Sequence, residues 1–186
     1  MLGEPPPIEL ANTTYAVRGR PQDGLRTTEQ LVAWLRDMRP RLAVALTDAD
    51  LRTVTESDLT VARELRVVVR SLADAIVHDH IPDPDLVAAL NRQVRRAPRW
   101  RELTLDPDPR AEVRSEARPV TAALAALAEE AVELFAGPFR HELHACPGPG
   151  CVLYFLRDHP RREWCSPVCG NRARAARHYA KTKRAG

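Results

Sequence analysis

The sequence predicts an α+β protein: a mainly helical N-terminal domain with a small β-sheet, residues 1–140, followed by a small cysteine-containing module, residues 141–186. In the N-terminal part, apolar residues recur at helical spacing over long stretches. In short stretches, apolar and polar residues alternate as they do in strands. All four cysteines lie between residues 146 and 169. From residue 146 onward there are nine Lys or Arg and two Asp or Glu, a net charge of +7, against −4 for the rest. This asymmetry is typical of a polyanion-binding appendage on an acidic body.

The chain is expected to begin with a strand, a loop and a helix. Residues 8–17 are β-leaning and predict a short strand, and the turn-rich residues 18–24 predict a loop. Thr27 and Gln30 form a capping-box pattern, so the first helix is expected from there to Pro40.

Two further helices are expected before residue 98. The longest begins after Ser57 and places six apolar residues on one face: Leu59, Ala62, Leu65, Val69, Leu72 and Ile76. Asp83 or Asp85 opens the next helix, which closes near Pro98.

The stretch up to residue 117 loses helical periodicity and predicts a small hairpin. Trp100, Leu103 and Leu105 alternate as in a strand, and residues 106–109, Asp-Pro-Asp-Pro, are a turn. An Ala-rich helix is expected from residue 119 to residue 136, where a Gly-Pro pair ends it. This helix would connect the helical domain to the module.

The four cysteines are Cys146, Cys151, Cys165 and Cys169. Their spacing is C-x4-C, then thirteen residues, then C-x3-C. Pro and Gly at 147–150 let the chain fold back, so both sulfurs of the first pair can aim at one point. The second pair shares one face if Cys169 begins or lies in a helix, whose N-terminus also favours thiolates. The pattern predicts one tetrahedral zinc site.

Other arrangements of these cysteines stay open. Two disulfides would suit a secreted protein, although the N-terminus has neither the basic start nor the apolar stretch of a signal sequence. Four cysteines also suit an iron–sulfur cluster. Three histidines are near enough to be rival ligands: His144, His159 and His178. With four thiolates no coordination position is left for water, so the zinc, one per chain, is expected to be structural.

The end of the chain predicts a basic helix. Four basic residues fall at i, i+3, i+7 and i+10 and form one stripe suited to DNA phosphates: Arg174, Arg177, Lys181 and Arg184. The alternative is a solvated helix face.

Residues 164–172, Trp-Cys-Ser-Pro-Val-Cys-Gly-Asn-Arg, resemble the CGNR zinc finger of bacterial proteins. The first cysteine pair, the aromatic Tyr154-Phe155 and Arg162 precede them in the order of that family, and Glu163 is a departure from its pattern. The resemblance implies a treble-clef-like or ribbon-like finger with a basic C-terminal helix over residues 141–186.

The preceding residues resemble the ABATE domain, which usually stands before such fingers. The resemblance rests on Leu10-Ala11-Asn12-Thr13, on residues 31–35 and on Leu65-Arg66. It implies an α/β domain, residues 1–140 here, of a stress-induced bacterial transcription regulator.

Four residues around the cysteines are expected to support the metal site. Four thiolates and one Zn²⁺ carry a formal charge of −2, which Arg172 would offset in part through N–H···S contacts, direct contact with DNA being the alternative. Gly170 would permit a close backbone approach, Asn171 would cap or brace the turn, and Trp164 would pack as a lid over the zinc.

A regulator needs an input, so the N-terminal domain is expected to offer an effector pocket. Asn12, Thr13 and Arg66 are its candidate residues. The alternative is turn chemistry at the first two and an ion pair at the third.

These observations predict a cytoplasmic DNA-binding transcription regulator, either monomeric or homodimeric, with no membrane partner. The alternative is a zinc-stabilised protein-interaction or RNA-binding adaptor. An enzyme is not expected, because the sequence has no nucleophile with a neighbouring base, no Gly-rich phosphate loop and no H-E-x-x-H pattern.

Overall fold

Seven α-helices and three separate two-stranded antiparallel sheets make up the part of the chain that the structure, a computed structural model, describes: residues 2–185, with the side chains of 181 and 183–185 excepted. The helices are α1 (Pro6–Ala11), α2 (Thr28–Met38), α3 (Asp48–Leu51), α4 (Glu56–Val77), α5 (Pro84–Val94), α6 (Pro119–Ala136) and α7 (Pro167–Ala185). The sheets are β1 (Thr14–Val17) with β2 (Arg20–Asp23), β3 (Trp100–Leu105) with β4 (Pro109–Arg114), and β5 (Leu143–Ala145) with β6 (Tyr154–Leu156). Short 3-10 helices follow α2 and α6, η1 (Arg39–Arg41) and η2 (Pro138–Glu142).

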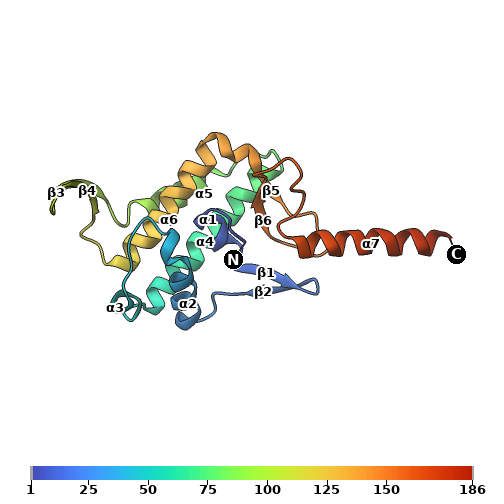
Figure 1. Ribbon diagram of the computed structural model, residues 1–186, viewed down its shortest axis with the longest axis horizontal. Helices are drawn as coiled ribbons and strands as arrows, with labels where there is room; N and C mark the ends of the chain where they lie inside the picture. Colours follow the sequence, from blue (N-terminus) through green and yellow to red (C-terminus); the bar gives the residue numbers. More distant parts are fainter. Residues whose placement is uncertain (1, 186) are drawn as a thin grey trace.

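Two long helices, α4 and α6, form the centre of the N-terminal body, and α1, α2 and α5 pack around them (Figure 1). The apolar face of α4 is buried as its periodicity requires, with Leu65 and Val69 fully inaccessible. The Ala-rich sequence of α6 lets neighbouring helices approach closely, and Ala123, Leu127 and Ala131 are fully inaccessible too. This helix is therefore a core element as well as the connection to the module.

The predicted strand over residues 8–17 is wrong in its first half, where the chain forms α1. Pro6 stands in its first turn, and Glu9 and Ala11 are buried as well as Ile8 and Leu10, so the alternation of the two large apolar residues does not mark one buried face. The Glu9 carboxylate accepts backbone N–H groups from residues 2, 3 and 4 at 2.8, 2.7 and 3.0 Å and holds the chain before the helix. Only β1 remains of the strand, and β2 occupies part of the predicted loop.

The other predicted elements of the body are confirmed, and caps set their starts. Thr27 caps α2 by accepting the Gln30 N–H, while Asp83 caps α5. The longest helix begins slightly earlier than predicted, at Glu56, because Thr55 is its N-cap and forms a reciprocal capping box with Asp58. The hairpin of β3 and β4 and the helix α6 lie where the sequence places them.

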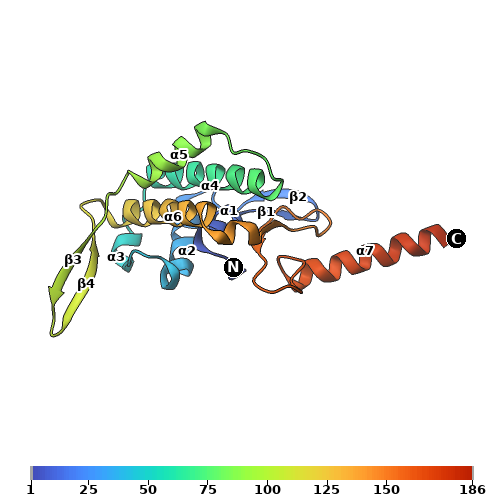
Figure 2. The same cartoon turned by 90° about the horizontal axis from the view of Figure 1, so that it is seen from above.

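Two elements project from opposite ends of the body, the β3–β4 hairpin and α7 (Figures 1 and 2). Leu103 and Leu105 on one face of the hairpin are 75% and 74% exposed, and Arg114 pairs with Glu102 and Glu112 on the other face. Within the described residues, no helix combines the length and the apolar character needed to cross a bilayer.

Candidate metal centre

The first cysteine pair stands on the turn between β5 and β6. Cys146 directly follows β5, and its N–H donates to the Leu153 carbonyl oxygen at 2.8 Å, while the Cys151 N–H donates to the Gly148 carbonyl oxygen at 2.9 Å. Gly148 is buried here: a Cβ at this position would lie 3.1 Å from Cys169 Cβ and 3.4 Å from Cys146 Sγ. The hairpin thus aims both sulfurs at one point, and glycine at this position lets the second pair approach without the crowding that a Cβ would cause.

The second pair comes from the start of α7. Cys165 precedes the helix and Cys169 lies in its first turn, where the Ser166 hydroxyl oxygen accepts the Cys169 N–H at 3.4 Å. The positive end of the helix dipole therefore faces the sulfurs and favours their thiolate form. Because the second pair stands on a helix rather than on another hairpin, the finger has the treble-clef-like arrangement and not the ribbon-like one.

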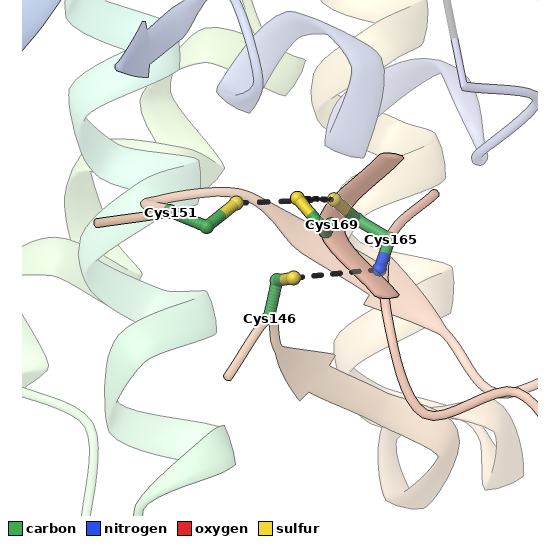
Figure 3. A group of neighbouring side chains, drawn as sticks. All are labelled: Cys146, Cys151, Cys165 and Cys169. Carbon is green, nitrogen blue, oxygen red and sulfur yellow. Dashed lines mark hydrogen bonds between the residues drawn. The ribbon is translucent and has the colours of Figure 1, made fainter. Parts of the chain in front are cut away.

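The four sulfur atoms gather around one centre (Figure 3) and all lie within 4.8 Å of one another. The Cys151–Cys165 and Cys165–Cys169 Sγ···Sγ separations are 3.8 and 3.5 Å. A tetrahedral ion with Zn–S bonds of ~2.3 Å requires sulfurs about 3.8 Å apart. Three of the cysteines are buried, and all four are free of disulfides. The residues present therefore fit one tetrahedral ion.

Without a cation, the sulfurs compete for protons. Hydrogen bonds from neighbouring thiols, that of Cys151 first, lower the pKa of Cys146, and the corresponding bond to Cys146 raises the pKa of Cys151. The same partner raises the pKa of Cys165. A bound dication removes this competition, because it stabilises all four sulfurs as thiolates.

Arg172 lies against the cluster, as expected for a residue that offsets its charge. Its Nη2 donates to Cys169 Sγ at 3.0 Å, and this bond raises the pKa of the guanidinium. Of the rival histidines, none belongs to the sulfur cluster in the described residues.

Trp164 packs against the cysteine cluster and also against α7. A Cβ on Gly170 would lie 3.1 Å from the Trp164 ring, so the close approach at this glycine is made by the indole rather than by the cluster. Asn171 does not cap the helix but braces Arg174, whose Nη2 donates to Asn171 Oδ1 at 2.6 Å. The Gly-Asn pair thus positions Trp164 and Arg174 beside each other.

The first two arginines of the basic stripe lie over the Trp164 indole. Arg174 and Arg177 are exposed, and their guanidinium carbons lie 5.7 and 6.0 Å from the centre of the Trp164 ring. The side chains of Lys181 and Arg184 lie outside the described residues.

The finger is joined to the body by polar and apolar contacts that sequence reasoning missed. Leu143 and Tyr154, from β5 and β6, belong to the same buried cluster as α4 and α6. Glu4 is 1% exposed, accepts the Leu156 N–H at 2.9 Å and forms an ion pair with Arg162. Arg70 lies over the Tyr154 ring at 5.1 Å. The contacts of Glu4 and Arg70 join residues more than 80 positions apart in sequence, so no local pattern indicates them.

The side chains of the three residues predicted to line an effector pocket form hydrogen bonds with other residues of the protein. The Asn12 side chain bonds both backbone groups of Tyr154, at 2.9 Å each. Arg66 donates to Asp23 Oδ2 at 3.0 Å and to Thr13 Oγ1 at 3.3 Å, and the bond lowers the pKa of Asp23. None of the three lines the cavity at the ends of α4 and α6. The alternative of turn and ion-pair chemistry fits Thr13, whose hydroxyl donates to the Leu10 carbonyl oxygen at 2.7 Å, and Arg66, which pairs with Asp23. It does not fit Asn12, whose partner lies in the finger.

Comparison with known families agrees with this geometry. The model of the family ABATE, described as "Putative stress-induced transcription regulator", matches residues 4–138. The model of the CGNR zinc finger matches residues 142–182, which include all four cysteines. No curated protein matches the sequence. The family and the sulfur geometry together identify the cluster as the site of one structural zinc ion.

Proposed function

Because the chain belongs to the ABATE family and carries a CGNR zinc finger, we propose that it is a transcription regulator in which the zinc ion anchors α7 as the DNA-binding helix. In this proposal the metal has no chemical role. It fixes the start of α7 relative to the β5–β6 hairpin, and through that hairpin relative to the body.

The observation that carries the proposal is the position of α7. This 19-residue helix, about 28 Å long, leaves the metal site and extends away from the body (Figures 1 and 2). It has no acidic residue, and its described side chains from Arg174 to Ala180 are all exposed. A helix with so little tertiary support is stabilised by a partner, and its basic surface favours a polyanion.

The pair of arginines on Trp164 supports contact with DNA rather than with an acidic protein surface. Both guanidinium groups lie over one indole, and within the described residues neither has a carboxylate partner. Stacking limits the rotamers of the two side chains, and apart from the Arg174 Nη2 bond to Asn171 their N–H groups stay available for phosphate or base contacts. Two cations that are ordered before binding lose less entropy on binding than solvated ones.

Effector sensing by the N-terminal domain belongs to the same proposal. The body contacts the finger through Glu4, Asn12 and Arg70, so a shift within the body can reach the hairpin that holds two zinc ligands. A homodimer is a further expectation, since two copies would place two basic helices on one duplex.

Selection from random sequences tests the proposal. The zinc-loaded full chain is incubated with a pool of random duplex DNA and, separately, with a pool of random RNA, and bound sequences are enriched over several rounds. We expect a motif to emerge from the duplex DNA pool and to be lost with Cys169→Ser, which removes one zinc ligand. Enrichment from the RNA pool alone would instead favour the RNA-binding adaptor, and enrichment from neither would favour the protein-interaction adaptor.

A further inference from the structure

A cavity with a volume of about 710 Å³ lies where the ends of α4 and α6 meet α5 and η2. Its volume is within the range of small-molecule sites, about 300–1,000 Å³. The floor is apolar and is formed by Leu72, Ile76, Leu90, Val132, Phe135 and Leu143. A floor of this kind suits the hydrocarbon part of a ligand.

The ionisable groups of the cavity are mostly basic. Arg140, His80, His141 and His144 line it, with Asp79 as the one carboxylate. Arg140 Nη1 donates to the Ala136 carbonyl oxygen at 3.2 Å, which leaves the other guanidinium donors available at the edge of the cavity. The polar groups therefore favour an anion over a cation.

One wall of the cavity is continuous with the zinc finger. Arg140 and His141 lie in η2, and Leu143 and His144 lie in β5, which leads directly to Cys146. Leu143 pairs with Leu156 on β6, so a molecule that contacts this wall touches the hairpin that carries the first cysteine pair.

We propose that this cavity is a binding site for a small amphipathic carboxylate, with its hydrocarbon part on the apolar floor and its carboxylate at Arg140. The site lies away from Asn12, Thr13 and Arg66. As the input of a transcription regulator it rests on the function proposed above, but the binding itself does not depend on DNA.

Binding of decanoate to the full zinc-loaded chain tests the site, with displacement of the fluorescent anion 1-anilinonaphthalene-8-sulfonate as the readout. We expect decanoate to bind at least about tenfold more tightly than 1-decanol, which has the same chain without the charge. Ala136→Trp fills the cavity from α6 and Val87→Trp fills it from α5, and each is expected to weaken decanoate binding by about tenfold or more. Arg140→Gln should abolish the preference for decanoate over decanol, while the exposed Arg52→Gln should leave it unchanged.

Equal affinities for decanoate and decanol in the parent protein would overturn the proposal. So would parental decanoate affinity in both tryptophan variants, provided that their zinc content and circular dichroism match the parent. Since no DNA is present, these results are independent of whether α7 binds DNA.

Discussion

The Asn12 side chain closes a pair of hydrogen bonds with the backbone of Tyr154, donating to its carbonyl oxygen and accepting its N–H, both at 2.9 Å. The two residues are 142 positions apart, and the contact joins the end of α1 to the first residue of β6. The finger is therefore docked on the body by specific contacts and not merely tethered to it.

Asn12→Ala is expected to destabilise the protein, because it leaves a buried N–H and a buried carbonyl of Tyr154 without partners. The expected loss is about 1–3 kcal/mol in the free energy of unfolding, measured by urea denaturation of the zinc-loaded protein. Asn91→Ala is the matched control: Asn91 lies in α5 outside this interface, and a change within roughly 0.5 kcal/mol is expected. Equal effects of the two substitutions would show that the Asn12–Tyr154 contact contributes little.

Removal of zinc should loosen the body as well as the finger. Leu143 and Tyr154 contribute to the core around α4, so loss of the metal that holds their hairpin exposes part of that core. Hydrogen exchange with and without a chelator should show reduced protection in α1 and in the second half of α4. Full exchange of residues 146–180 with unchanged protection of α1 and α4 would mean that the finger unfolds independently.

Arg172→Ala is expected to weaken zinc binding by about 10–100-fold, because the Nη2–Sγ contact to Cys169 offsets part of the negative charge of the cluster. Competition with a chromogenic chelator measures the affinity. Arg177→Ala is the control, since this exposed arginine contacts Trp164 and not a cysteine. Unchanged zinc affinity together with a lost DNA sequence preference would assign Arg172 to base recognition instead.

The ion pair between Arg66 and Asp23 should make stability depend on acid pH. The hydrogen bond from Arg66 lowers the pKa of Asp23, so its carboxylate stabilises the fold above the ordinary pKa and loses this effect as pH falls through the lowered value. Between about pH 7 and about pH 3, Asp23→Asn should therefore lose less stability than the parent in urea denaturation. The exposed Asp37→Asn is the control and should follow the parent. An identical loss in all three proteins would contradict the assignment.

Local signals were sufficient for most elements and for the metal ligands. The ends of α6 follow from Pro119 and Gly137, and the four cysteines and Arg172 follow from spacing and from the charge of a thiolate cluster. These features depend on residues close together in sequence.

The missed features depend on contacts between distant parts of the chain. Ile8 and Leu10 alternate as in a strand, but burial on all sides and the Glu9 carboxylate stabilise a helix there. The role of Asn12 depends on Tyr154, which no pattern near residue 12 reveals. The closeness of Gly148 to Cys169 was missed as well, although the Pro-Gly-Pro-Gly turn is a signal that could have indicated it.

The salt dependence of DNA binding tests the central claim most directly. Each phosphate neutralised by a cation steepens the fall of log affinity with log salt by about 0.9, so Arg174→Ala with Arg177→Ala should lower that slope by about 1.8 at unchanged zinc content. Arg101→Ala with Arg110→Ala removes the same charge from the β3–β4 hairpin at the other end of the molecule and is the matched control. We predict a lower slope for the α7 variant alone. Parental slope and affinity in that variant, or an equal reduction in both, would contradict the assignment of α7 as the DNA-binding helix.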